Sequence, residues 1–185
     1  MEYKEIISET KDLMAKAVEY SKGQIAKVRT GRATASLVDN LKADFYGSPT
    51  PISQMANIST PDARTIVIQP YDRTTLSGIE KAIQASDLGF NPQNDGTIIR
   101  IPVPPLTEQR RKEYVKLAKK YAEEGKVAVR NVRRDQIEVL RKSEKDKVLT
   151  EDEKKRGEEE TQKITDQHIK LIDEVSVAKE KELMD

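Results

Sequence analysis

Basic side chains are the residues of this sequence whose types and spacing best suit a defined chemistry. Arg130, Arg133 and Arg134 stand at positions i, i+3 and i+4, so they share one face if the segment is helical. On a helical wheel of about 100° per residue, they belong to a basic sector roughly 100° wide. Its members are Lys112, Lys116, Lys119, Lys126, Arg130, Arg133, Arg134 and Arg141. Because guanidinium groups bind phosphate oxygens in a bidentate manner, this sector indicates a phosphate-rich partner.

The basic sector also has a plainer interpretation, since basic helix faces are often only solvated or paired with acidic neighbours. Glu123 and Glu144 fall within it and dilute it. Segregation of charge along the chain favours phosphate recognition. Residues 105–147 hold 14 Lys+Arg and 8 Asp+Glu, a net charge of +6, whereas residues 148–185 hold 7 and 12, a net charge of −5. With only 4% aromatic residues, the chain is suited to the backbone of structured RNA rather than to stacking on single strands.

Other chemistry is poorly represented. The absence of Cys excludes disulfides, thiolate catalysis and iron–sulfur clusters. The one His, His168, stands three residues before Leu171 on a helical pattern, which favours helix packing over general-base catalysis. The acidic runs 151–153 and 158–160 are more typical of the start of a helix than of a metal site. No glycine-rich phosphate loop occurs, so we expect no enzyme, no metal and no cofactor.

The distribution of proline divides the chain. All eight prolines lie between Pro49 and Pro105, and residues 31–104 are also poor in charge. Proline costs about 3 kcal/mol inside a helix, so its absence from both flanks permits long helices there. The sequence therefore predicts an α+β protein. A discontinuous helical domain of residues 1–30 and 105–185 would carry an inserted domain of residues 31–104.

Apolar periodicity in the flanks predicts three helices forming an elongated antiparallel bundle. The first segment repeats apolar residues from Tyr3 to Val28 at helical spacing. The second begins after a predicted N-cap at Thr107 and repeats roughly every 3.5 residues, which is typical of a bundle seam. That expected seam comprises Tyr114, Leu117, Tyr121, Ala128, Val132 and Val139.

A capping box at residues 150–153 separates the second helix from a third, with a break near Val148 and Leu149. The third helix is expected to bury Ile164, Leu171, Ile172, Val175 and Ala178.

The insert has the pattern of a small β/α/β domain. Residues 41–46, 65–69 and 97–101 are expected strands, since they alternate or carry β-branched runs bounded by Pro, Gly and Asn. Residues 75–86 are expected to be helical.

Targeting and membrane signals are not expected. Residues 1–14 carry charges every few positions and lack the apolar region of a secretory signal. No stretch approaches the roughly 18 apolar residues of a spanning helix. We therefore expect a soluble, cytoplasmic protein with no membrane partner.

Several blocks of sequence, taken in order, carry a family resemblance. They are Lys27-Val28-Arg29-Thr30-Gly31-Arg32-Ala33, Tyr46-Gly47-Ser48-Pro49-Thr50-Pro51, Ser86-Asp87-Leu88-Gly89 with Asn91-Pro92, Arg100-Ile101-Pro102-Val103-Pro104-Pro105-Leu106-Thr107-Glu108 and Val127-Ala128-Val129-Arg130-Asn131-Val132-Arg133-Arg134-Asp135. Along essentially its whole length the chain resembles the ribosome recycling factor family of the bacterial type.

The resemblance implies an L-shaped protein whose bundle and inserted arm are joined by two short linkers. It implies binding to the post-termination 70S-type ribosome and, with elongation factor G and GTP hydrolysis by that factor, separation of the subunits with release of mRNA and tRNA. We expect a monomer that acts mechanically.

The resemblance also assigns residues to these roles. Arg29, Arg130 and Arg133 are expected to contact large-subunit rRNA, with Arg110, Arg134 and Lys126 as further candidates. The expected hinge consists of two segments of three residues each. They are Thr30, Gly31 and Arg32, and Val103, Pro104 and Pro105.

Two other function classes stay open at this point. A helical adaptor or chaperone would use the bundle to bind protein, with the basic face merely solvated, and its binding would be insensitive to moderate salt. An enzyme acting through the insert would need a polar pocket with perturbed ionisable groups, which the sequence of the insert does not suggest.

Overall fold

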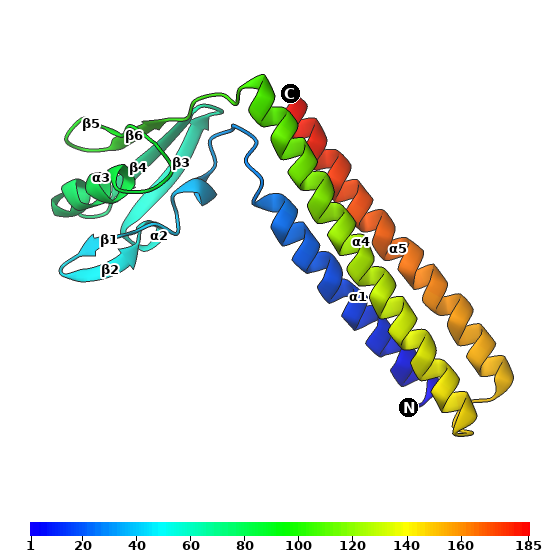
Figure 1. Ribbon diagram of the computed structural model, residues 1–185. Helices are drawn as coiled ribbons and strands as arrows, with labels where there is room; N and C mark the ends of the chain where they lie inside the picture. Colours follow the sequence, from blue (N-terminus) through cyan, green and yellow to red (C-terminus); the bar gives the residue numbers. More distant parts are fainter. The chain divides into compact units, whose positions relative to one another are not determined.

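A computed structural model describes residues 1–185 and divides them into two compact units. The first unit contains residues 1–30 and 108–185, and the second contains residues 31–107 (Figure 1). The second boundary therefore lies at Thr107 and Glu108, somewhat later than the expected Pro104-Pro105.

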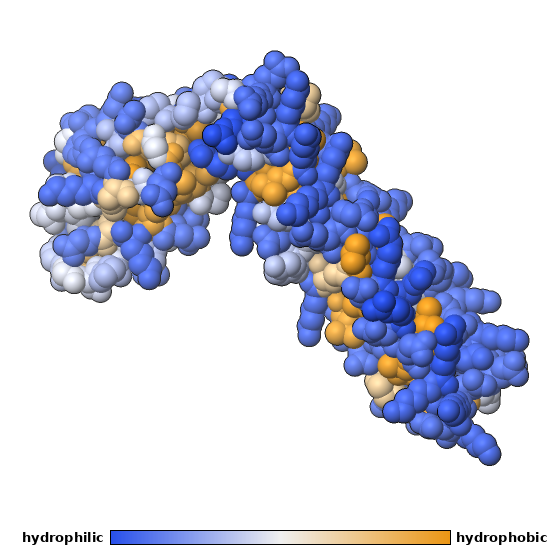
Figure 2. Space-filling view, in the orientation of Figure 1, coloured by the Kyte–Doolittle hydropathy of each residue, from blue (hydrophilic) through white to orange (hydrophobic).

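The first unit is a bundle of three long helices. They are α1 (Tyr3–Ala26), α4 (Glu108–Lys145) and α5 (Glu151–Met184), with α4 running antiparallel to the other two (Figure 1). At 1.5 Å per residue, the 38 residues of α4 span about 57 Å. The surface of the bundle is largely hydrophilic and is broken by small apolar patches (Figure 2).

The turn between α4 and α5 confirms the predicted capping box. The backbone N–H of Glu153 donates to the Thr150 hydroxyl at 3.1 Å, and the Thr150 N–H donates to the Glu153 carboxylate at 2.8 Å. Lys147 takes a positive φ of 60° after the end of α4, where glycine is the usual residue. The Val148 N–H then reaches back to the Ser143 carbonyl at 2.9 Å and satisfies one of the last carbonyls of α4.

The buried line of α4 lies one residue away from the expected seam. The most deeply placed residues are mostly small ones, and they are Ala118, Ala122, Gly125, Val129, Gln136, Leu140 and Ser143. The expected seam residues, such as Leu117 and Val132, are only half-buried and border this line. On α5, Leu171 and Ala178 are exposed rather than buried, so that expectation was wrong for both. Small side chains take the deepest positions because they allow neighbouring helices to approach closely.

Two glycines mark the places of closest approach. A Cβ added to Gly125 would lie 2.6 Å from the Cβ of Ser21 on α1. A Cβ added to Gly157 on α5 would lie 2.7 Å from the Cδ2 of Leu140 on α4. Both distances are too short for any side chain, so these positions require glycine for packing rather than for backbone freedom.

A polar level interrupts the apolar core of the bundle. One apolar cluster includes Val129 and Ile164, and a separate one includes Leu140. Gln136 stands between them on α4 and is 2% exposed, but its Nε2 has no protein partner. The buried hydroxyl of Thr161 on α5 also lacks one. An unpaired buried polar group costs about 1–3 kcal/mol of stability. The apolar packing on either side of this level must offset that cost.

The second unit contains two antiparallel sheets. β1 (Lys42–Phe45) pairs with β2 (Ser48–Pro51), and a four-stranded sheet has the order β3-β4-β6-β5. The strands of the larger sheet are β3 (Ala56–Asp62), β4 (Thr65–Pro70), β5 (Gln93–Asn94) and β6 (Ile99–Pro102). The helices are α2 (Ile52–Met55) and α3 (Leu76–Gln84), with 3-10 turns at Ala35–Leu37 and Arg73–Thr75.

The core of the insert lies between α3 and the larger sheet. Ile66 and Ile68 of β4, Ile99 and Ile101 of β6 and Ile79 of α3 are all fully buried. The sequence predicted β1, β4, β6 and α3 near their observed places but did not predict β2, β3, β5 or α2. Proline explains two of these omissions, since Pro49 and Pro61 lie inside β2 and β3. Both are edge strands, and the β3 register shifts between Ser59 and Asp62, so the missing N–H groups are tolerated.

None of the helices combines the length and the hydrophobicity that a membrane-spanning segment requires.

The packing at Gly125 generates a stability test. Gly125→Ala would gain up to about 1 kcal/mol of helix propensity. The same substitution would force Ser21 and its helix to shift, which costs about 1–3 kcal/mol. We therefore expect the free energy of unfolding to fall overall. Gly23→Ala in α1 is the matched control, because a Cβ there meets nothing within 4 Å and should stabilise the protein by up to about 1 kcal/mol. Chemical denaturation of both variants measures the difference, and equal stabilisation by both would contradict the close approach.

Candidate nucleic-acid interface

The basic sector of α4 is present in the structure but divides into two lines with different surroundings. One line, which we call the inner line, faces α5 and consists of Lys119, Lys126, Arg133 and Arg141. The other, the outer line, is exposed to solvent and consists of Lys112, Lys116, Arg130 and Arg134. The helical wheel could not separate them, because the separation depends on where α5 packs.

The inner line pairs with α5 in a regular ladder. The Lys119 ammonium lies 3.9 Å from the Glu180 carboxylate, and Lys126 forms an ion pair with Asp173. Farther along, the Nε of Arg141 lies 3.1 Å from the Glu158 carboxylate. The seven residues from Lys119 to Lys126 are matched by seven back from Glu180 to Asp173, and the fifteen from Lys126 to Arg141 by fifteen back to Glu158. Steps of one and about two heptads are expected for antiparallel helices. Lys126 is only 21% exposed, so its pair with Asp173 is the strongest of these contacts, whereas Lys119 and Arg141 are 62% and 58% exposed and contribute less each. Together the contacts match α4 to α5, which is a structural role for these three basic residues.

Arg133 occupies an intermediate position in this ladder. Its side chain is half-buried, and its Nη1 donates to the Gln162 amide oxygen at 2.8 Å. The Gln162 amide in turn donates to the Asp166 carboxylate at 2.9 Å. The Nε of Arg133 is buried without a protein partner. Arg133 is therefore partly committed to α5, while its charge is not neutralised by a direct carboxylate contact.

The outer line carries arginines with weak, replaceable contacts. Arg130 lies 3.3 Å from Glu123 and its side chain is 48% exposed, while Arg134 lies 3.9 Å from Asp135 and is 71% exposed. Exposed ion pairs of this kind contribute about 0–1 kcal/mol, so a phosphate can replace the carboxylate at little cost. Among the expected site residues of α4, Arg134 and Arg110 are the most accessible, at 71% and 63% exposed, and Arg130 follows at 48%.

The remaining expected anchors have different surroundings. Arg110 is exposed in the first turn of α4, 3.4 Å from Glu113. Arg29 follows the end of α1 and is half-buried. The end of α1 and the start of α4 lie toward the same end of the bundle, with α4 extending farther (Figure 1). Lys126, by contrast, is only 21% exposed and is paired with Asp173, so its ammonium is largely occupied.

The residues of the expected hinge also differ in their surroundings. Gly31 has a φ of 76°, a conformation that glycine adopts without strain, and it lies against Leu106. Val103 is buried in the insert, and its N–H donates to the Arg64 carbonyl at 2.7 Å. Pro104 and Pro105 are exposed. Val103 is thus fixed within the insert, and the freer part of the second connection begins at Pro104.

The residues considered for catalysis or metal binding have structural surroundings. The Nδ1 of His168 is 2.7 Å from the Ile164 carbonyl on its own helix, which accounts for the half-buried ring. Glu151, Asp152 and Glu153 form the first turn of α5, where negative charge complements the helix dipole. No group of three or more His, Asp or Glu side chains is arranged to hold a metal ion.

The insert has an exposed aromatic site that sequence reasoning missed. Tyr46 has a φ of 50° in the β1–β2 turn, is 74% exposed, and donates from its hydroxyl to the Asp72 carboxylate. Tyr71, beside Asp72, is 73% exposed. A positive φ strains the backbone of a tyrosine. The sequence signal that could have revealed this site was a tyrosine, rather than a second glycine, in the turn just before Gly47.

Comparisons with known proteins match nearly the whole chain, across both units. The family model described as "Ribosome recycling factor" matches residues 21–184. The chain is 56% identical over 180 residues to the ribosome-recycling factor of Oleidesulfovibrio alaskensis, covering 97% of this chain and 98% of that protein. It is 52% identical over 181 residues to that of Bacillus licheniformis, covering 98% of each.

Two solved structures are similar over the whole chain. A solution structure of the ribosome recycling factor matches with a TM-score of 0.78 and 46% identity, over 100% of this chain and 98% of that one. The second comes from models of the T. thermophilus ribosome recycling factor and the E. coli elongation factor G bound to the E. coli post-termination complex. It matches with a TM-score of 0.67 and 46% identity over 100% of both chains.

The ladder predicts that carboxylates facing the two lines differ in their effect on stability. Asp173→Asn leaves the poorly exposed Lys126 without its partner and should lower the free energy of unfolding by about 1 kcal/mol, with a smaller loss at high salt. Asp135→Asn removes only the exposed contact with Arg134 and should change stability by less than about 0.5 kcal/mol. Urea denaturation at two salt concentrations measures both variants, and losses of equal size would argue against a structural ladder.

The Tyr46 contact predicts a titration. The hydroxyl of Tyr46, followed by the hydrogen bonds from Thr74, holds the pKa of Asp72 below its ordinary value of 3.8. Tyr46→Phe should therefore raise the pKa of Asp72 toward that value, as measured by NMR of the carboxyl carbon. Because the folded-state pKa is depressed, the stabilisation is present above the unfolded pKa and is lost as pH falls through the folded one. An unchanged pKa in Tyr46→Phe would show that the phenol does not bind Asp72 in solution.

Proposed function

Since the chain belongs to the ribosome recycling factor family, we propose that it binds the post-termination ribosome and, with elongation factor G and GTP, separates it into subunits. The separation frees mRNA and tRNA for another round of translation. The family consists of translation factors rather than enzymes, and the proposed action is mechanical. Support for the two partners comes from the similar T. thermophilus factor, which is described with elongation factor G on the post-termination complex.

The proposed contact surface centres on the outer line of α4. Arg130 and Arg134 would bind phosphates of large-subunit rRNA, because their present carboxylate contacts are weak and exposed. Arg133 would add a guanidinium between the two lines, while Arg29 and Arg110 would extend the contact to the end of the bundle. Lys126 would contribute mainly through its charge, because its ammonium is paired with Asp173.

The proposed mechanism uses the bundle as a stiff body. Helices that pack through Gly125 and Gly157 and are joined by the ladder resist bending, so a force applied at one place is transmitted along them. The insert would receive the action of elongation factor G and meet the small-subunit side. The connections at Thr30, Gly31 and Arg32 and at Val103, Pro104 and Pro105 would act as the hinge, with most of the second motion at the two prolines.

The protein would act as a single copy in the cytoplasm, where translating ribosomes are found. It would need no cofactor and no metal of its own.

The observation that carries the proposal is the exposed arginine pair of the outer line, and its test is a splitting assay. Post-termination complexes are incubated with the protein, elongation factor G and GTP, and subunits are resolved by sedimentation. We expect the wild type to produce subunits and the Arg130→Glu, Arg134→Glu double variant to split them at least about tenfold more slowly, since each lost phosphate contact weakens binding.

The matched control is Lys155→Glu, an exposed cation on α5 that pairs only with Glu151 at 3.7 Å. It should split ribosomes at the wild-type rate. Failure of the wild type to split complexes that another recycling factor does split would contradict the proposed function. Equal rates for all variants would remove the outer arginines from the mechanism, whereas ribosome binding that is absent or insensitive to moderate salt would indicate the helical adaptor.

A further inference from the structure

The last turn of α1, which finishes at Ala26, has no cation of its own, and the first basic residue after it is the C-cap, Lys27. The carbonyl groups at a helix C-terminus have no partner within the helix and carry partial negative charge. The chain then leaves the helix through Lys27 and the buried Val28 to reach Arg29.

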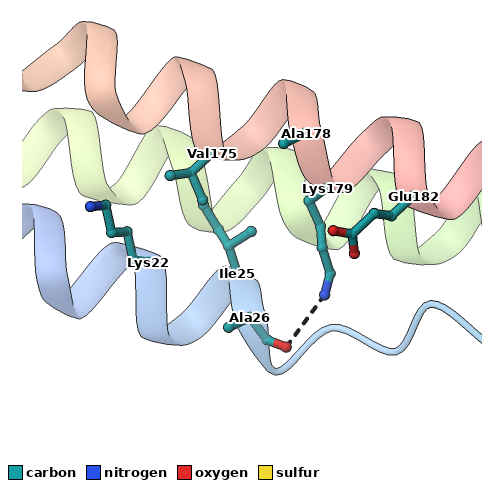
Figure 3. A pocket seen from close by; sticks show the side chains of 7 residues that line it. All are labelled: Lys22, Ile25, Ala26, Val175, Ala178, Lys179 and Glu182. Carbon is teal, nitrogen blue, oxygen red and sulfur yellow. Dashed lines mark hydrogen bonds between the residues drawn. The ribbon is translucent and has the colours of Figure 1, made fainter. Parts of the chain in front are cut away.

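A lysine from another helix fills this gap. The ammonium of Lys179 on α5 donates to the Ala26 carbonyl at 3.3 Å, crossing from one helix to the other (Figure 3). Its stem forms part of the wall of a hollow of about 290 Å³. The other lining residues are Lys22, Ile25, Ala26, Val175, Ala178 and Glu182. No carboxylate lies within 4 Å of the ammonium, so the bond to Ala26 is its one direct partner in the protein.

The surroundings of Lys179 do not favour its charged form. Burial lowers the pKa of Lys179 from its ordinary value, and the charge of Glu182 only partly opposes this. A folded state that holds a proton less well than the unfolded state gains stability as pH rises toward the unfolded pKa. Keeping Lys179 charged in this partly buried position therefore costs stability instead of adding to it. What Lys179 contributes is its hydrogen bond to the Ala26 carbonyl.

We propose that Lys179 is a positioning residue that fixes the end of α1 and thereby sets where Arg29 leaves the bundle. This inference rests on the proposed function, in which Arg29 contacts rRNA. The Ala26 carbonyl is three residues before Arg29, and only the turn closed by the Val28 N–H on the Ile25 carbonyl at 3.1 Å separates them. Freeing that carbonyl loosens the turn, so the Arg29 guanidinium meets its phosphate less often in the right place.

Lys179→Met is the informative variant, because methionine keeps an apolar stem in the hollow and removes the donor. We expect faster hydrogen exchange at the Val28 amide of the free protein, by about fivefold or more, with little change in Tm. Affinity for the large subunit should fall about three- to tenfold, while the slope of log Kd against log salt stays as in the wild type, because no phosphate contact is removed. Lys179→Arg should restore both properties, since a guanidinium can also donate to the Ala26 carbonyl.

Two comparisons separate positioning from direct contact. Arg29→Met should lower the salt slope by about one phosphate contact, unlike Lys179→Met. Lys181→Met, an exposed lysine of the same helix, should change neither exchange nor affinity.

The outcomes that overturn the inference are distinct from failure of the proposed function. Unchanged exchange at Val28 would show that Lys179 does not hold the turn. Faster exchange with unchanged affinity would reduce Lys179 to a structural contact, and a reduced salt slope would make it a phosphate ligand itself. If the wild type shows no salt-dependent binding to the large subunit, the proposed function fails and the positioning role falls with it, whatever the exchange rates are.

Discussion

The close approach of α4 to its neighbours through small residues is the constraint on which the rest of the bundle depends. Gly125 admits Ser21 of α1, and Gly157 of α5 admits Leu140. This proximity fixes the rotation of α4, and that rotation decides which basic residues face α5 and which face solvent. A larger residue at either glycine would displace a helix and with it the whole distribution of charge.

The charge of α4 consequently serves two purposes. Lys119, Lys126 and Arg141 are matched to acidic residues of α5 and favour one register of the two helices. The outer line keeps cations that no neighbouring helix neutralises. A near-neutral chain can thus present a basic surface, because the acidic residues of α5 compensate one line and not the other.

Much of the fold could be predicted from the sequence. The confinement of proline to residues 49–105 gave the long helices and the place of the insert, and Thr150 and Glu153 marked the start of α5. The seam was misplaced by one residue because Ala118, Ala122 and Gly125 are too small to stand out as apolar positions. Likewise β2 and β3 contain prolines and polar residues that favour loops. The division of the basic residues into two lines depends on tertiary packing, which no single helical pattern contains.

The central claim is that the outer line of α4 is an anchor for phosphates rather than a solvated face. The most direct measurement is the salt dependence of binding to the large ribosomal subunit, for the wild type and for the Arg130→Ala, Arg134→Ala double variant. The account predicts that the slope of log Kd against log salt falls by roughly 0.7–0.9 for each arginine removed. An unchanged slope in the double variant would contradict it.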